Sequence, residues 1–236
     1  MNTFILAFSL LGSFPASASE VTLAGAWKHH DTSTTESRIY THGHFSVSIY
    51  SLEGKQFVGT FGGKYVVSGD KLNELIEFDT QKPERVGTEQ SGTFSITKDK
   101  LTLSGSPGIT LIRADDGTPG ELAGAWLITG RVVDNELRKS TPGARRTMKI
   151  LSGTRFQWIA YNVDTKEFSG TGGGTYTTVN GKYTENIEFF SRDNSRVGAS
   201  LVFDYSLEEG DWHHKGLSSK GEPINEVWTK REKVGL

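Results

Sequence analysis

The sequence contains no cysteine. This absence excludes disulfide bonds, thiolate metal sites, a cysteine nucleophile and a lipid-anchored cysteine. The chain also has no large excess of positive or negative charge, because its net charge is −2 and its isoelectric point is near 6.3. No global field would therefore draw the chain to nucleic acid or to an anionic membrane, and we expect no nucleic-acid partner.

Long apolar runs are almost absent. Phe4 to Phe14 is apolar but too short to span a bilayer, and Ala16-Ser17-Ala18 supplies the small-x-small pattern that a signal peptidase accepts. We predict a signal peptide over residues 1–18, although Met1-Asn2-Thr3 has no basic side chain; the alternative is a buried N-terminal strand. No later run predicts a membrane span. An exported chain without disulfides favours a periplasmic location, with secretion as the other possibility.

Sustained helical periodicity is also missing. Leu, Ile and Val are diluted by Thr, Ser and 28 glycines, a composition typical of short strands and many turns. Phe45 to Tyr50 alternates apolar and small polar residues, and Asn180-Gly181 between two such runs is a hairpin signal. We predict an all-β chain of antiparallel meanders, each of about eight strands closed into a barrel.

An internal repeat is the strongest signal in the chain. Leu23 to Trp27 recurs as Leu122 to Trp126. Gly59 to Tyr65 matches Gly170 to Tyr176 at an offset of 111 positions, and the matches continue at this offset without a gap. The last of them pairs Arg85-Val86-Gly87 with Arg196-Val197-Gly198. We infer a duplication that places one barrel over residues 19–114 and another over 121–236.

The two copies differ in length. The tryptophans are offset by only 99 positions (27 to 126), so the second copy has gained 12 residues after its tryptophan. We place the gain at Arg131 to Arg146, which is basic, contains Pro142-Gly143 and is predicted to be a long loop. The linker, residues 114–120, is short enough to keep the units packed together as an internal pseudo-dimer. The oligomeric state stays open.

Each copy starts with the same short motif, Gly25-Ala26-Trp27 or Gly124-Ala125-Trp126, and has a basic residue on its last predicted strand. That residue is Arg113 in the first copy and Lys230 or Arg231 in the second. With this motif and this basic residue, the units resemble the lipocalin-like superfamily, which includes lipocalins, fatty-acid-binding proteins and avidins. The resemblance implies that each tryptophan plugs one barrel end beneath the cation. It also implies an apolar pocket at the other end.

The second copy carries the better candidates for ligand contact. Trp158 has no aromatic counterpart, since it aligns with Val47, and it shares a strand face with Phe156. Glu185 and Tyr183 share one face, as a polar anchor or as a structural group bonded to Arg196. The aromatic positions that repeat are expected mainly to fill the interior. The candidate ligand-binding residues are Trp158, Tyr161, Tyr176, Tyr183, Glu185 and Arg196.

Other chemical motifs are not supported. Gly170 to Gly174 is followed by a strand rather than by the helix that a phosphate loop needs. Glu185 and Glu188, like their first-copy equivalents, are three apart and point to opposite strand faces. The six histidines come in close pairs that do not repeat, so a surface or turn role is favoured over a metal site. We expect no metal, no cofactor and no nucleophilic catalysis.

Three functions remain. The leading hypothesis is an exported protein that binds an apolar or amphipathic small molecule, with the second copy as the better site. The second is an envelope scaffold whose barrels are packed solid. The third is a barrel isomerase or hydrolase that uses Glu185 and Tyr183 as acid–base groups; convergence of both with Arg196 in an open pocket would favour it.

Overall fold

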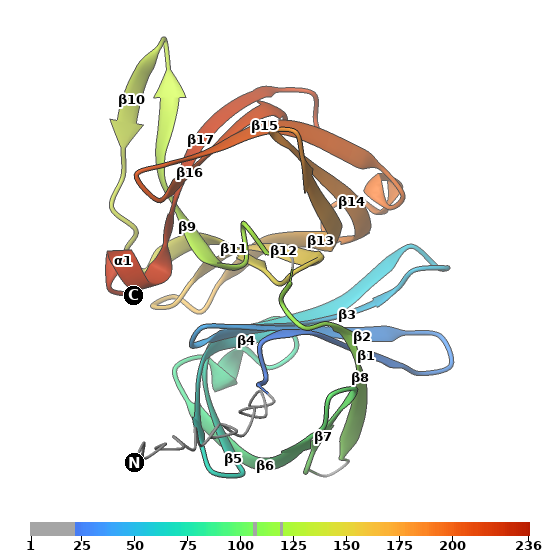
Figure 1. Cartoon of the computed structure of the whole chain (residues 1–236). Coiled ribbons are helices and arrows are strands. Elements are labelled where there is room, and N and C mark those ends of the chain that lie inside the picture. Colours follow the sequence, from blue (N-terminus) through green and yellow to red (C-terminus); the bar gives the residue numbers. More distant parts are fainter. Residues whose placement is uncertain (1–21, 106–107, 119) are drawn as a thin grey trace, which may run out of the picture.

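Two closed antiparallel β-barrels of eight strands each, arranged in tandem, make up the molecule (Figure 1). The computed structural model describes residues 22–105, 108–118 and 120–236, so the predicted signal peptide lies outside the described residues. The predicted fold class is confirmed. Within the described ranges, no helix has the length and apolar character needed to cross a membrane.

The first barrel is a meander in which each strand pairs with the next and the last closes onto the first. A 3-10 turn, η1 (Pro83–Arg85), precedes its sixth strand. The strands are β1 (Gly25–His30), β2 (Thr35–Thr41), β3 (His44–Ser51), β4 (Gln56–Ser68), β5 (Lys71–Asp79), β6 (Glu89–Ile96), β7 (Lys100–Leu103) and β8 (Ile109–Asp115).

The second barrel repeats this order and closes through β9 and β17. A 3-10 turn, η2 (Asn194–Arg196), and a short helix, α1 (Arg231–Val234), complete it. The strands are β9 (Gly124–Val133), β11 (Arg145–Leu151), β12 (Arg155–Asn162), β13 (Phe168–Val179), β14 (Lys182–Phe190), β15 (Ser200–Glu208), β16 (Asp211–Leu217) and β17 (Pro223–Lys230).

The extra residues of the second copy do not form the long loop expected for 131–146. β9 continues to Val133 and turns back into β10 (Glu136–Lys139), a hairpin that projects from the barrel (Figure 1). Asp134 and Asn135 form the turn with positive φ angles of 54° and 62°, the backbone that a two-residue hairpin needs. The basic side chains of this segment therefore lie on a hairpin.

Each motif tryptophan is buried inside its barrel beneath a basic side chain. The guanidinium carbon of Arg113 lies 4.0 Å from the Trp27 ring centre, and Lys230 Nζ lies 5.3 Å from that of Trp126. Both indole N–H groups donate to a backbone carbonyl four residues earlier, at 3.0 and 2.8 Å. Arg231, the other candidate for this role, points into the contact between the barrels instead.

β5 carries a β-bulge at Glu77. Gly63 pairs with Ile76 and the residue before it pairs with Phe78, so Glu77 has no residue opposite it. A Cβ atom on Gly63 would lie 2.0 Å from the carbonyl oxygen of Leu75, so the bulge needs glycine at this position. The bulge turns Glu77 toward the second barrel.

β14 has the same bulge at Glu188, with Gly174 opposite Ile187. The bulge reverses the alternation of side chains along the strand. Ile187 faces the barrel interior, whereas Phe189 stacks on Tyr50 of the first barrel at 4.8 Å. The bulge therefore separates Phe189 from the inward face on which Ile187 lies.

The barrels contact each other through equivalent residues. The Tyr50 hydroxyl donates to Glu188, and the hydroxyl of its counterpart Tyr161 donates to Glu77 at 2.8 Å. Each tyrosine thus reaches the bulged glutamate of the other copy. This reciprocity is the pattern of an isologous dimer interface, here formed within one chain.

Two further contacts lie where equivalent residues of the two copies meet. Phe57 stacks on its own counterpart, Phe168, with ring centres 6.3 Å apart. The Gln157 side-chain amide donates to Thr60 at 2.8 Å and to the equivalent Thr171 at 3.0 Å. These contacts mark a local two-fold axis between the barrels.

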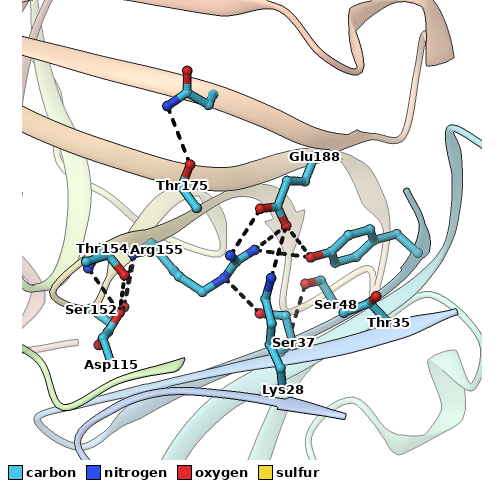
Figure 2. Close-up of polar contacts among 12 residues, drawn as sticks. Lys28, Thr35, Ser37, Ser48, Asp115, Ser152, Thr154, Arg155, Thr175 and Glu188 are labelled. Atoms are coloured by element: carbon cyan, nitrogen blue, oxygen red, sulfur yellow. Dashed lines mark hydrogen bonds and ion pairs between the residues drawn. The ribbon is translucent and has the colours of Figure 1, made fainter. Parts of the chain in front are cut away.

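Buried ion pairs fix this arrangement on both sides. Arg155 donates to Glu188 at 3.1 and 2.5 Å, to Ser37 at 3.2 Å and to Tyr50 at 3.1 Å (Figure 2). Lys28 Nζ approaches the same carboxylate at 3.6 Å. Three groups from both barrels therefore converge on one glutamate.

Glu77 is the corresponding centre on the other side. The fully buried Arg231 donates to both of its oxygens, at 2.8 and 2.9 Å, and Arg146 adds a bond at 2.9 Å. Tyr161, predicted as a ligand contact, belongs to this cluster, because Trp158 on the same strand faces inward and Tyr161 lies on the opposite face.

Candidate ligand-binding site

A cavity of about 740 Å³ opens within the second barrel. Its walls come from the inward faces of β11, β12 and β14 to β17, and its mouth is lined by η2, the start of the hairpin and the β16–β17 turn. The lining includes Lys149, Trp158, Glu185, Phe190, Phe203, His214, Glu226 and Trp228. Both aromatic and ionisable side chains thus face one space.

Trp158 forms one wall because the neighbouring strand leaves room for it. Gly172 lies opposite Trp158 in the strand pair, and a Cβ there would lie 2.7 Å from the indole nitrogen. Phe190 packs edge-on against the indole at 5.5 Å. In the first barrel Val47 takes the place of Trp158, and Phe61 takes the place of Gly172. The phenyl ring of Phe61 packs against the core of that barrel.

Lys149 and Glu185 form a buried ion pair at the cavity floor, with Nζ and Oε1 2.7 Å apart. The ammonium group also lies 5.0 Å from the ring centres of Tyr183 and Trp212, and 5.4 Å from that of Trp228. Aromatic faces stabilise a cation at such distances. The floor therefore holds a positive charge with one carboxylate partner.

The counterpart of Lys149 in the first barrel is Arg38, which is more completely paired. Arg38 donates to Glu36 at 2.6 Å and to Tyr40 at 3.4 Å. The second barrel has Thr147 and Leu151 at the positions of those two partners. Arg38 thus has partners on its own strand, whereas Lys149 has one carboxylate partner and faces a cavity.

His214 and Glu226 lie opposite each other on β16 and β17. His214 Nδ1 is 3.6 Å from Glu226 Oε2, beyond hydrogen-bond length, and neither ring nitrogen of the buried His214 has a partner among the described residues. The buried indole nitrogen of Trp228 also has none there. Buried polar atoms are normally paired, so three nitrogens without a partner among the described residues are an unusual feature of this cavity.

The first barrel has apolar residues at these positions. Leu103 and Ile109 form the matching strand pair, and Leu111 takes the place of Trp228. All three pack into the core of the first barrel. The polar floor is thus a property of the second barrel.

Burial, reinforced by the nearby charge of Lys149, lowers the pKa of His214 to about 4, so its imidazole is neutral at pH 7. Burial would raise the pKa of Glu226, but His214, Lys149 and Arg131 outweigh it and lower that pKa. Burial and the adjacent Glu185 raise the pKa of Tyr183 well above its usual value. A neutral imidazole offers one donor and one acceptor, which suits a hydroxyl or carbonyl group.

These titrations predict that stability falls as the solution becomes acidic. Burial and the charge of Arg231 lower the pKa of His44 to about 4, as burial does for His214. Unfolded histidine takes up a proton near pH 6.5, so stability present above pH 6.5 is lost as the pH falls to 4. Urea unfolding from pH 7.5 to 4.5 should show a loss of about 2 kcal/mol for each histidine. The His214→Leu variant should lose about half as much, and a free energy of unfolding that stays constant over this range would contradict the assignment.

A second loss is expected at lower pH. Burial opposes ionisation of Glu77 and Glu188, but hydrogen bonds from Arg231 and Arg155 outweigh it and lower each pKa to about 2. A depressed carboxylate pKa contributes stability above pH 4.5 that disappears as the pH falls toward 2. The two losses of stability can be separated by pH, because the histidines titrate between pH 6.5 and 4 and the two glutamates titrate between pH 4.5 and 2.

The structure distributes the predicted site residues over three places. Trp158, Glu185 and Arg196 line the cavity. Tyr183 and Tyr176 are buried in the core below it, where the Tyr176 hydroxyl donates to the carbonyl of Ser152 at 2.6 Å. Tyr161 lies between the barrels. Arg196 bonds to Asp193 at 3.1 Å, not to Glu185.

Sequence reasoning missed Lys149, His214 and Glu226. His44 and His214 are both buried, which corrects the surface or turn role favoured for the histidines. The alignment carried a signal, because His214 coincides with Leu103, an apolar position of the other copy. A charged or imidazole side chain at a core position of one repeat alone indicates a change in what that interior contains.

Metal-binding geometry is not found in the part of the chain that the structure describes, where no three His, Asp or Glu side chains gather as a ligand set. Comparison with known proteins adds no family: no family model matches the chain, and no curated protein matches it. The two barrels are consistent with a lipocalin-like fold.

Proposed function

We propose that the second barrel binds one small amphipathic molecule and that the first barrel is its structural support. The observation that carries this proposal is the set of unpartnered nitrogens of His214 and Trp228 at the floor of an aromatic cavity. An apolar body would pack on Trp158 and Phe190. A hydroxyl or carbonyl group at its end would accept from the indole and bond to the imidazole.

The same reasoning makes the first barrel a support rather than a second site. Its interior places Phe61, Leu103 and Leu111 in one apolar core. Its contacts through Glu77 and Tyr50 hold the two barrels together. The scaffold hypothesis thus applies to the first barrel in this proposal.

Acid–base catalysis is not favoured. Glu185 is bound to Lys149, and Arg196 is bound to Asp193, so these groups do not converge with Tyr183 on one reacting atom. Binding needs only the cavity and its polar floor. We therefore propose binding without chemistry.

We further propose that the chain is a lipocalin-like protein exported to the periplasm or secreted. The support is the apolar run before Ala18 and the two Gly-x-Trp barrels with a cation over each tryptophan. Intact-mass measurement on protein from the periplasm or medium should give a chain that begins at residue 19. A full-length chain recovered only from the cytoplasm would contradict export.

The binding proposal predicts the result of exchanging the floor for that of the first barrel. In the double variant His214→Leu, Glu226→Ile, the imidazole and its carboxylate neighbour are replaced by apolar residues like those of the first barrel, while Lys149, Glu185 and Trp228 remain. The polar end of the ligand therefore loses its imidazole partner. We expect lipophilic molecules extracted from natively purified wild-type protein to be at least tenfold depleted in the variant, as measured by mass spectrometry.

Stability provides the control for this exchange. Replacing buried polar groups by well-packed apolar residues is often neutral or stabilising, so the variant should unfold at the same or higher urea concentration than wild type. The matched pair Leu103→Ala, Ile109→Ala in the first barrel should lower stability but leave the extracted molecules in place. Equal extracts from wild type and the His214, Glu226 variant would refute the proposal.

A further inference from the structure

The mouth of the second barrel carries several charges, most of which are neutralised by neighbours. Arg196 Nε is 3.1 Å from Asp193 Oδ2, and Arg131 lies 3.5 Å from Glu226. At the floor, Lys149 is paired with Glu185. Lys220 and Glu222 of the β16–β17 turn also line the mouth, and their opposite charges leave little net charge from that turn.

Arg192 is different. It forms no ion pair with any residue that the structure describes. Its Nε and Nη2 atoms donate to the carbonyl oxygen of Ser169 at 2.9 and 2.6 Å, and no bond is formed by Nη1 within the described residues. The guanidinium carbon lies 5.9 Å from the ring centre of Trp158. A cation is thus held against the aromatic wall of the cavity.

A glycine leaves room for the side chain at this position in both copies. A Cβ atom on Gly170 would lie 2.4 Å from Arg192 Nε, and one on the equivalent Gly59 would lie 2.9 Å from Gln81 Cδ. The first copy thus holds the neutral Gln81 where the second holds Arg192. The charge at the mouth is therefore specific to the copy that has the cavity and Trp158.

We infer that the ligand of the second barrel is an organic anion with a flat aromatic or conjugated body. Its carboxylate, sulfonate or phosphate oxygens bond to Arg192 at the mouth, and its body lies along Trp158 and Phe190. The inference rests on the proposed function and adds the charge and shape of the molecule bound. Arginine is suited to the role because its N–H groups match the oxygens of such anions, and an aromatic ring packs well on indole.

Two fluorescent probes with the same aromatic skeleton test this. Anilinonaphthalene sulfonate carries an anionic group that phenylnaphthylamine lacks. We expect the wild-type protein to bind the sulfonate more tightly, and Arg192→Gln, which installs the first-copy residue, to weaken sulfonate binding about fivefold or more. Binding of phenylnaphthylamine should change less than twofold. Added salt should weaken only sulfonate binding.

Two control variants separate the ways in which this can fail. Thr147→Trp places bulk in the cavity and should reduce binding of both probes, whereas Arg138→Gln on the exposed hairpin should affect neither. If Thr147→Trp changes neither probe, the cavity is not the site and the proposed function fails. If both probes bind there equally and Arg192→Gln changes neither, the cavity stands and the anion inference is overturned.

Discussion

Replacing Glu77 by alanine should lower the free energy of unfolding by about 3–5 kcal/mol, among the largest effects expected from any single substitution in this chain. The Glu77 carboxylate accepts two hydrogen bonds from the fully buried Arg231, whose Nη1 also contacts Met148 and Tyr161, and one from Arg146. Its removal leaves a guanidinium buried without a counter-charge between the barrels. Urea unfolding of wild type and Glu77→Ala at pH 7 gives the difference.

Matched variants separate this effect from the loss of any surface charge. Glu84→Ala removes an exposed carboxylate nearby on η1 and should stay within about 0.5 kcal/mol of wild type. Glu188→Ala should cost less than Glu77→Ala, because the Glu188 side chain is 17% exposed and that of Glu77 is 7% exposed. A loss below about 1 kcal/mol for Glu77→Ala would show that the ion pair does not hold the barrels together.

Gly63→Ala should cost about 3 kcal/mol, the upper end of the range for overpacked sites. The new Cβ would lie 2.0 Å from the carbonyl oxygen of Leu75, and that oxygen belongs to the backbone and cannot rotate away. The bulge at Glu77 would have to open, which also moves the glutamate away from Arg231. Thermal or urea unfolding measures the cost.

Gly143→Ala is the control for that substitution. A Cβ at Gly143 meets no heavy atom within 4 Å, so the variant should be as stable as wild type. Gly174→Ala should resemble Gly63→Ala, since its Cβ would lie 2.0 Å from the carbonyl oxygen of Asn186 in the equivalent bulge. If Gly63→Ala and Gly143→Ala were equally stable, the bulge would not be a fixed feature of the fold.

Much of the fold follows from the sequence because repetition is visible without any structure. The offset of 111 positions predicts that each strand of one copy has a partner in the other, and the Gly-x-Trp motifs predict two barrels. The repeat does not predict which residue of each strand forms a β-bulge. Gly63 and Gly174 were visible as repeated glycines, but the choice of Glu77 and Glu188 as the unpaired residues depends on pairing across strands.

That local choice also decides where Phe189 lies. Strict alternation places Phe189 inside the barrel, whereas the bulge places it against Tyr50 of the first barrel. Tyr161, a predicted ligand contact, lies three positions from Trp158 on one strand, so the two side chains point to opposite faces. Its repetition in Tyr50 is instead the signature of an interface in which each copy presents the same face to the other.

The floor of the cavity was harder to predict, because its residues lie on strands far apart in the sequence. Lys149 is on β11, Glu185 on β14 and His214 on β16, and only closure of the barrel brings them to one space. Each is a buried polar residue on a strand that also carries exposed polar residues, so the strand's own sequence does not single it out. Such residues predict an unusual interior once the copies are compared position by position, with Leu103 opposite His214 in the alignment.

If the second barrel alone holds a ligand, native mass spectrometry of the purified chain should find one bound molecule per chain in the wild-type protein and in the Leu103→Ala, Ile109→Ala variant. It should find none in the His214→Leu, Glu226→Ile variant. Two molecules per chain, or one molecule that persists in the His214→Leu, Glu226→Ile variant, would show that the second barrel is not the single binding site.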